Sequence, residues 1–194
     1  VYAVYIAGFF WVCLWRLRWR WLGLVPIAAA ASAAPFLAER PDILISNTGT
    51  VVAVRDGSGI LRISARRPSD FVLDQWFERE GEHVPDRDSL ATGIVCDRSA
   101  CLAQLKDGAG WLAHIRQPEA FAEECRKAYI IVTPLAAPSN CRAELVIDKT
   151  ALERLGAHSI TIVTGSDTER AGRPAFNVRT AYPENLRPWQ GVSP

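Results

Sequence analysis

Three arginines alternate with aromatic and aliphatic side chains in residues 15–21, between two apolar segments. Arginine is costly to place in hydrocarbon and tryptophan prefers the lipid headgroups, so Arg16, Arg18 and Arg20 with Trp19 and Trp21 predict a turn anchored at a membrane surface. A short arginine-rich loop stays on the cytoplasmic side. The chain from residue 39 onward is therefore expected on the opposite, periplasmic or extracellular, side.

The two apolar segments are expected to be the end of a membrane helix bundle, which forms a first region over residues 1–38. Residues 1–14 are fewer than the roughly twenty that cross a bilayer, so we interpret them as the end of a helix. Because the chain starts on valine and contains no methionine, we expect a C-terminal piece of a longer protein. The second segment, residues 22–38, contains Pro26 and Pro35, which neighbouring membrane helices tolerate.

A signal peptide is the alternative for this region. It would have a basic start at residues 16–20, an apolar middle and a small-residue cleavage site near Ser32. The apolar residues before the arginines do not suit it. Both interpretations export the rest of the chain.

Charge argues against a protein that grips nucleic acid over a broad face. Three of the 22 Lys and Arg residues and none of the 21 Asp and Glu residues precede residue 39, so the remainder carries 19 basic against 21 acidic side chains. Broad phosphate binding usually needs a strongly basic surface. We expect one soluble domain over residues 39–164 and, because residues 165–194 are polar and proline-rich, a flexible tail.

Four of the five cysteines fall in the soluble part, and an even number in an exported domain suggests disulfides. Cys96 and Cys101 flank a four-residue turn between apolar runs, which places them opposite each other in a hairpin. Elimination then pairs Cys125 with Cys141. Free buried cysteines are one alternative. A zinc site with His114 is another, although the closing histidine of that spacing is missing.

The hydrophobic pattern predicts a mixed α and β domain of two similar halves. Two glycine-rich turns at residues 56–59 and 107–110 each separate a pair of strands, and each second strand is followed by a proline and a helix. The strands are expected at residues 42–46, 51–55, 60–65, 92–96, 101–106, 111–116, 129–133, 143–147 and 159–163, and the helices near residues 70–80, 118–127 and 149–155.

The segments Cys96-Asp97-Arg98-Ser99-Ala100-Cys101, Ala122-Glu123-Glu124-Cys125, Cys141-Arg142-Ala143-Glu144-Leu145-Val146-Ile147-Asp148 and Leu155-Gly156-Ala157-His158 resemble the C-terminal end of the ComEC-type competence proteins. These polytopic inner-membrane proteins carry single-stranded DNA into the cytoplasm during natural transformation. The resemblance covers residues 34–163 and implies an α+β, αββα-like fold similar to the metallo-β-lactamases, preceded by a transmembrane helix.

The sequence departs from that family's metal-binding pattern. Metal-binding members carry a His-x-His-x-Asp-His cluster, whereas His83, His114 and His158 are single and far apart. We therefore expect a degenerate domain with no cofactor, no metal ligands and no catalytic residues. His114 is expected either in the core or half exposed, and His83 in solvent.

Two further groups of charged residues are candidates for a functional role. Asp70 with Asp74 and Glu119 with Glu123 form carboxylate pairs at helical spacing, which solvated helix surface explains better than acid–base catalysis. Arg62, Arg66 and Arg67, with Arg55 nearby, form a local basic patch that could guide a DNA backbone towards a channel, although a plain solvated loop explains these arginines better.

The sequence thus predicts the C-terminal fragment of a bacterial inner-membrane competence protein. The soluble domain would lie on the periplasmic side and support transport of single-stranded DNA, with the membrane, DNA and other competence proteins as partners. One alternative is a metal-dependent hydrolase or nuclease acting on incoming DNA. Another is a membrane-anchored, exported binding module unrelated to DNA.

Overall fold

The computed structural model divides the chain into two compact units, Val1–Arg40 and Pro41–Pro194. It describes residues 1–16, 18–37, 40–65, 68–81, 84, 86–108, 110–163 and 175–182.

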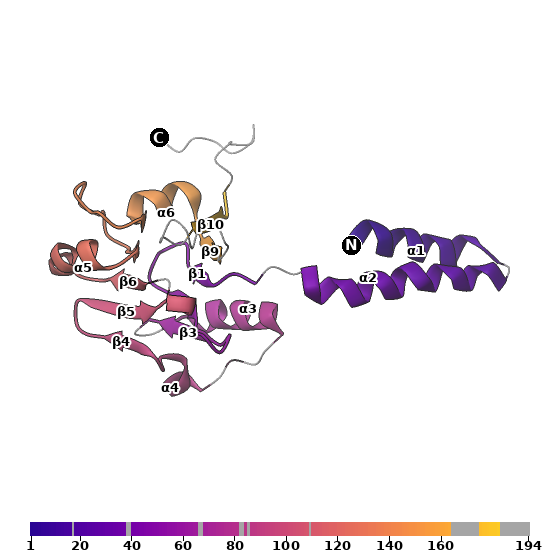
Figure 1. Cartoon of the computed structure of the whole chain (residues 1–194), viewed down its shortest axis with the longest axis horizontal. Coiled ribbons are helices and arrows are strands. Elements are labelled where there is room, and N and C mark those ends of the chain that lie inside the picture. Colours follow the sequence, from indigo (N-terminus) through magenta and orange to yellow (C-terminus); the bar gives the residue numbers. More distant parts are fainter. Residues whose placement is uncertain are drawn as a thin grey trace. The chain divides into compact units, whose positions relative to one another are not determined.

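The first unit is a helical hairpin (Figure 1). Helix α1 (Tyr2–Leu14) is followed by a 3₁₀ turn, η1 (Arg18–Gly23), and helix α2 (Leu24–Leu37). Gly8 and Gly23 let the helices approach closely, because a Cβ added at Gly8 would lie 2.8 Å from the carbonyl oxygen of Gly23. Apolar side chains remain exposed along α1, including Tyr2, Phe9 and Phe10.

The arginine–tryptophan stretch forms the turn of this hairpin, as its position between two apolar segments predicts. Arg16, Arg18 and Arg20 are exposed, and the Arg20 guanidinium lies 5.0 Å from the ring centre of Trp21. The expected transmembrane helix is not found, since no helix in the described residues is both long enough and apolar enough to cross a bilayer. Helices α1 and α2 have 13 and 14 residues, against the roughly twenty that a span needs.

The second unit contains two five-stranded sheets and is α+β, as expected. One sheet has the order β10-β9-β1-β2-β3 and is antiparallel throughout. The other has the order β4-β5-β6-β7-β8, in which β6, β7 and β8 run parallel. The strands of the first sheet are β1 (Ile43–Ile45), β2 (Val52–Arg55), β3 (Leu61–Ser64), β9 (His158–Val163) and β10 (Ala175–Thr180). Those of the second are β4 (Ile94–Cys96), β5 (Ala100–Gln104), β6 (Trp111–Ile115), β7 (Ile130–Val132) and β8 (Leu145–Ile147).

Helices connect the strands at intervals along this unit. They are α3 (Asp70–Glu80), α4 (Arg87–Leu90), the 3₁₀ turns η2 (Lys106–Gly108) and η3 (Pro118–Ala120), α5 (Phe121–Lys127) and α6 (Lys149–Leu155). Proline at the start of η3 and glycine at the ends of α3 and α6 set their boundaries.

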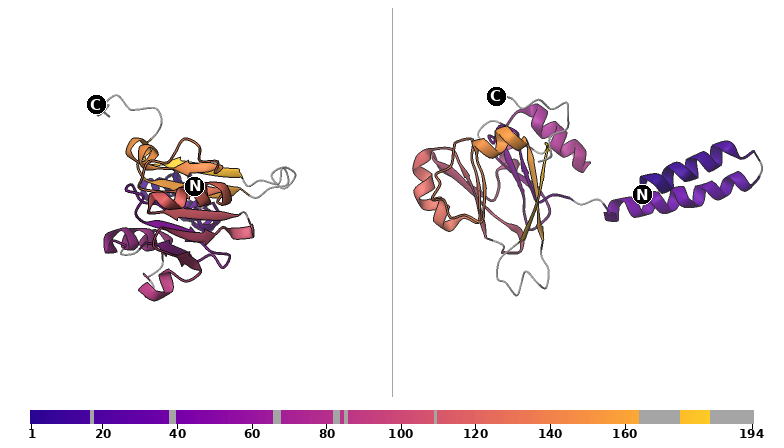
Figure 2. Two further views of the ribbon diagram at one scale, coloured as in Figure 1. Left: turned by 90° about the vertical axis from the view of Figure 1, so that its left-hand side faces the viewer. Right: turned by 90° about the horizontal axis from the view of Figure 1, so that it is seen from above.

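The sheets face each other, and helices cover their outer faces (Figure 2). The inner core joins residues of both sheets, among them Ile43, Val52, Leu112 and Ile130. The outer face of the first sheet packs against α3 through Leu73 and Phe77, while that of the second packs against α5. Four layers result, in the order helix, sheet, sheet, helix.

The predicted halves are visible in the strand order. Three antiparallel strands, β1 to β3, lead into α3, and three antiparallel strands, β4 to β6, lead into η3 and α5. We call these the first half and the second half. Strands β7 and β8 then extend the second sheet, whereas β9 and β10 return to the first.

The prediction of a flexible tail over residues 165–194 is wrong for residues 175–180, which form β10. All six residues pair with β9, so the folded unit extends beyond residue 164. The apolar side chains of Phe176 and Val178 alternate along this segment, and both pack against the inner core. The pairing with β9 is long-range, so the polar, proline-rich composition around it did not indicate a strand. The remaining tail residues lie outside the described residues, apart from 181 and 182.

Candidate functional site

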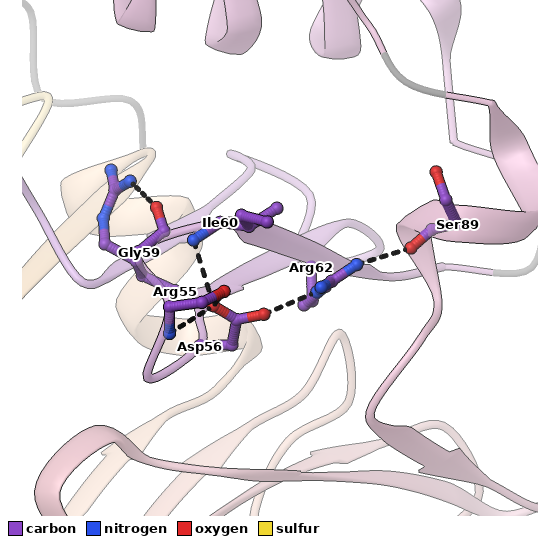
Figure 3. A network of polar contacts seen from close by, with 7 residues as sticks. Arg55, Asp56, Gly59, Ile60, Arg62 and Ser89 are labelled. Atoms are coloured by element: carbon purple, nitrogen blue, oxygen red, sulfur yellow. Dashed lines mark hydrogen bonds and ion pairs between the residues drawn. The ribbon is translucent and has the colours of Figure 1, made fainter.

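Arg62, the first residue of the predicted DNA-guiding patch, is held by two contacts, one to the β2–β3 turn and one to α4 (Figure 3). Its Nε donates to Asp56 Oδ2 at 2.8 Å, and its Nη1 donates to the Ser89 carbonyl at 2.9 Å. Burial raises the pKa of Asp56, but hydrogen bonds from Ser58, Arg62 and Ile60 outweigh it and lower that pKa to about 2. Arg62 therefore braces the β2–β3 turn against α4, and its role in guiding DNA stays a prediction.

Arg55 does not extend this patch, because its side chain is buried. Its Nη1 donates to the Gly59 carbonyl at 2.7 Å (Figure 3), and its Nε donates to the Pro41 carbonyl at 3.2 Å. Its Nη2 lies 3.0 Å from Glu80 Oε1 at the end of α3. Arg66 and Arg67, the other members of the predicted patch, lie outside the described residues.

His114 lies in the core between the two sheets and is 1% exposed. Its Nε2 donates to the Gly49 carbonyl at 2.9 Å, which leaves Nδ1 to accept from the Ser64 hydroxyl at 2.8 Å. Burial is the main cause that lowers the pKa of His114 to about 4. Both ring nitrogens are occupied, so this histidine joins the halves rather than facing a ligand. His83 lies outside the described residues.

Both predicted disulfides are present. Cys96 and Cys101 are directly paired in the β4–β5 hairpin, and Cys125 of α5 is bonded to Cys141 in the loop after β7. The thiol of Cys13 is free and exposed. Neither cysteine of the hairpin is available to a zinc ion while this bond persists.

Acidic residues and histidines do not gather into a metal site in the described part of the chain, where no three His, Cys, Asp or Glu side chains lie close enough to hold an ion. Of the carboxylate pairs, Glu123 forms an ion pair with Lys127 on the same helix, and this contact lowers its pKa. Burial raises the pKa of Glu124 beside it. Asp70 and Asp74 lie at the exposed surface of α3.

The structure brings together two pairs of arginines that the sequence analysis did not single out. Arg126 and Arg142 line a broad groove beside α5. Arg79 and Arg179 line a smaller hollow of about 260 Å³ beside α3, together with Trp76. Arg79 and Arg179 are 100 residues apart in sequence and lie together only because β9 and β10 join the first sheet. No local sequence pattern could therefore have revealed their proximity.

The sequence did contain an indication that Arg126 and Arg142 are neighbours. Each of these arginines directly follows a cysteine of one disulfide, in Cys125-Arg126 and Cys141-Arg142. Once those cysteines are paired, the two arginines must be neighbours.

Comparisons with known proteins give no relative from which a role could be taken: no protein-family model, curated protein or solved structure matches the chain.

Proposed function

We propose that this chain is the C-terminal part of a ComEC-type competence protein, and that its two-sheet unit is a degenerate metallo-β-lactamase-like domain that supports passage of single-stranded DNA across the inner membrane. The observation that carries this proposal is the pair of facing halves. Each half consists of three antiparallel strands followed by a helix on the outside. That layer order is the one implied by the resemblance of residues 34–163.

The covalent chemistry supports an oxidising compartment. Disulfides persist in oxidising compartments such as the periplasm and are rare in the cytosol, and this unit has two. The hairpin before it exposes apolar side chains and has an arginine–tryptophan turn between its two helices, as suits contact with a lipid surface. The hairpin would hold the unit at the membrane, next to the rest of the channel, and the disulfides favour the periplasmic side.

The test is genetic and uses the full-length gene in the bacterium that encodes it. Deleting the codons for residues 41–182 in frame should lower the frequency of transformation by linear DNA at least a hundredfold. Plasmid delivered by conjugation serves as the control, because it bypasses this uptake route and should be received normally. Unchanged transformation would overturn the proposal and leave an exported binding module unrelated to DNA.

A further inference from the structure

A groove of about 830 Å³ runs along the outer side of the second half, between α5 and the loop after β7. Its walls are mostly apolar, with Phe121 and Ala122 on the helix side and Leu135 and Pro138 on the loop side. Its polar lining residues are Asn140, Arg126 and Arg142, and no carboxylate among the described residues lines it. An open, apolar groove lined by two arginines suits an extended anionic chain better than a compact metabolite.

The disulfide builds this groove. Cys125–Cys141 links α5 to the loop, and the backbone N–H of Arg142 donates to the Cys125 carbonyl at 3.3 Å. The two Cys-Arg dipeptides are thereby held side by side. Their adjacent arginines are both exposed, in contrast to the buried Arg55 and the braced Arg62.

Two guanidinium groups beside one groove repel each other unless an anion lies between them. Neither forms an ion pair with the described residues, and Glu123, one helical turn before Arg126 on α5, pairs with Lys127. The disulfide links the backbone on both sides, so only the two arginine side chains need to be ordered when an anion arrives. This preorganisation lowers the cost of binding.

We propose that this groove binds the sugar–phosphate backbone of single-stranded DNA, with phosphates on Arg126 and Arg142 and unstacked bases along the apolar wall. The proposal rests on the proposed function for its choice of anion. Single strands fit because their base faces are free to contact an apolar surface, whereas a duplex hides them. Two phosphate contacts give modest, salt-dependent binding. The logarithm of the association constant should fall by roughly 1.4 for each tenfold rise in salt concentration.

The hollow at Trp76, Arg79 and Arg179 is the competing surface. It also combines an aromatic ring with two arginines, but it has less than a third of the volume of the groove. Because it lies beside α3 and the groove beside α5, variants of each surface can be made without touching the other.

The experiment measures binding of the whole chain, in detergent micelles, to a fluorescein-labelled dT20 oligonucleotide by fluorescence anisotropy between 50 and 300 mM salt. The double variant Arg126→Gln/Arg142→Gln should bind at least tenfold more weakly and lose most of its salt dependence. Arg154→Gln, which changes an exposed arginine on α6, is the matched control and should bind like wild type. Circular dichroism and a count of free thiols check that each variant keeps its fold and both disulfides.

Three outcomes would overturn the proposal. One is unchanged binding by the Arg126→Gln/Arg142→Gln variant. A second is loss of binding in Arg79→Gln/Arg179→Gln alone, which would place DNA on the other hollow. The third is stronger competition by a poly-glutamate peptide than by unlabelled dT20, which would indicate a protein partner. Because this readout is binding and not transformation, the groove can fail while the proposed function stands, and the reverse.

Discussion

The two halves of the sandwich have similar strand order but are stabilised by different chemistry. In the first half, charged side chains tie the elements together: Arg55 joins β2 to the end of α3, and Arg62 joins the β2–β3 turn to α4. In the second half, covalent bonds do so: Cys96–Cys101 closes the β4–β5 hairpin, and Cys125–Cys141 fixes α5. The first half should therefore respond to pH and the second to reductant.

The difference also separates structural arginines from available ones. Where ion pairs hold the fold, as at Arg55 and Arg62, the guanidinium groups are occupied. Where disulfides hold it, Arg126 and Arg142 are left at the surface. In the half whose elements are joined by disulfides, two arginines thus remain exposed beside one groove.

The largest effect is expected from Glu80→Ala. The change leaves the guanidinium of Arg55 buried without its carboxylate, and breaking a buried pair in this way costs about 3–5 kcal/mol. Urea unfolding of the whole chain, followed by circular dichroism, measures this loss. Glu78→Ala, an exposed position on the same helix, should stay within about 0.5 kcal/mol of wild type. A loss below about 1 kcal/mol in Glu80→Ala would show that the ion pair does not hold the first half.

The second half should lose less when its covalent ties are removed. Cys125→Ala/Cys141→Ala opens a link with a sequence separation of 16, for which chain entropy predicts about 3 kcal/mol. Cys96→Ala/Cys101→Ala opens one with a separation of 5, for which the same relation gives about 2 kcal/mol. Equal losses in urea unfolding, or a larger loss for the short loop, would contradict this order.

Sequence patterns predicted the local structure of both halves well, because alternation, helical periodicity and glycine turns act over short distances. Helix α6 has the predicted bounds, residues 149–155, and the pairing of Cys96 with Cys101 followed from a four-residue turn. The partition of the strands between two sheets was not predictable in this way. It depends on contacts such as Ile43 with Ile160, which are far apart in sequence.

The candidate site was harder to predict than the fold. Clustering in sequence pointed to Arg62, yet the structure gives that residue a bracing role that depends on Asp56 and Ser89. The exposed arginines of the groove stand 16 positions apart and are united by a disulfide. Composition shows how many charges a chain has, but only tertiary contacts decide which of them remain unpaired.

His114 joins the halves and should make the whole sandwich sensitive to acid. Its pKa is about 4 in the folded protein against the ordinary 6.5, so folding favours the neutral ring. The contribution of the neutral ring to the free energy of unfolding is fully present above pH 6.5, and it falls by about 3 kcal/mol as the pH drops from 6.5 to 4. Urea unfolding at pH steps from 7 to 4 should show a shallower loss in His114→Asn than in wild type. Parallel slopes would contradict a buried neutral histidine at this joint.

The smallest effect is expected from Arg62→Gln, which weakens the brace of the first half without burying a charge. The ion pair is partly exposed, with side-chain exposures of 18% for Arg62 and 30% for Asp56, so a loss of about 1 kcal/mol at pH 7 is expected. The pKa of Asp56 should also rise from about 2 towards its ordinary 3.8, because one of the bonds that lowers it is gone. Since that pKa is lowered by folding, the contribution of Asp56 is present above pH 3.8 and is lost as pH falls towards 2. Carbon-detected NMR titration of the Asp56 carboxyl measures the shift directly.

Arg98→Gln, in the β4–β5 turn of the second half, is the matched control. It changes an exposed arginine in the hairpin that a disulfide closes, and it should leave the free energy of unfolding within about 0.5 kcal/mol of wild type. If the two variants lose the same amount, the charged brace and the disulfide do not differ in how they hold their hairpins.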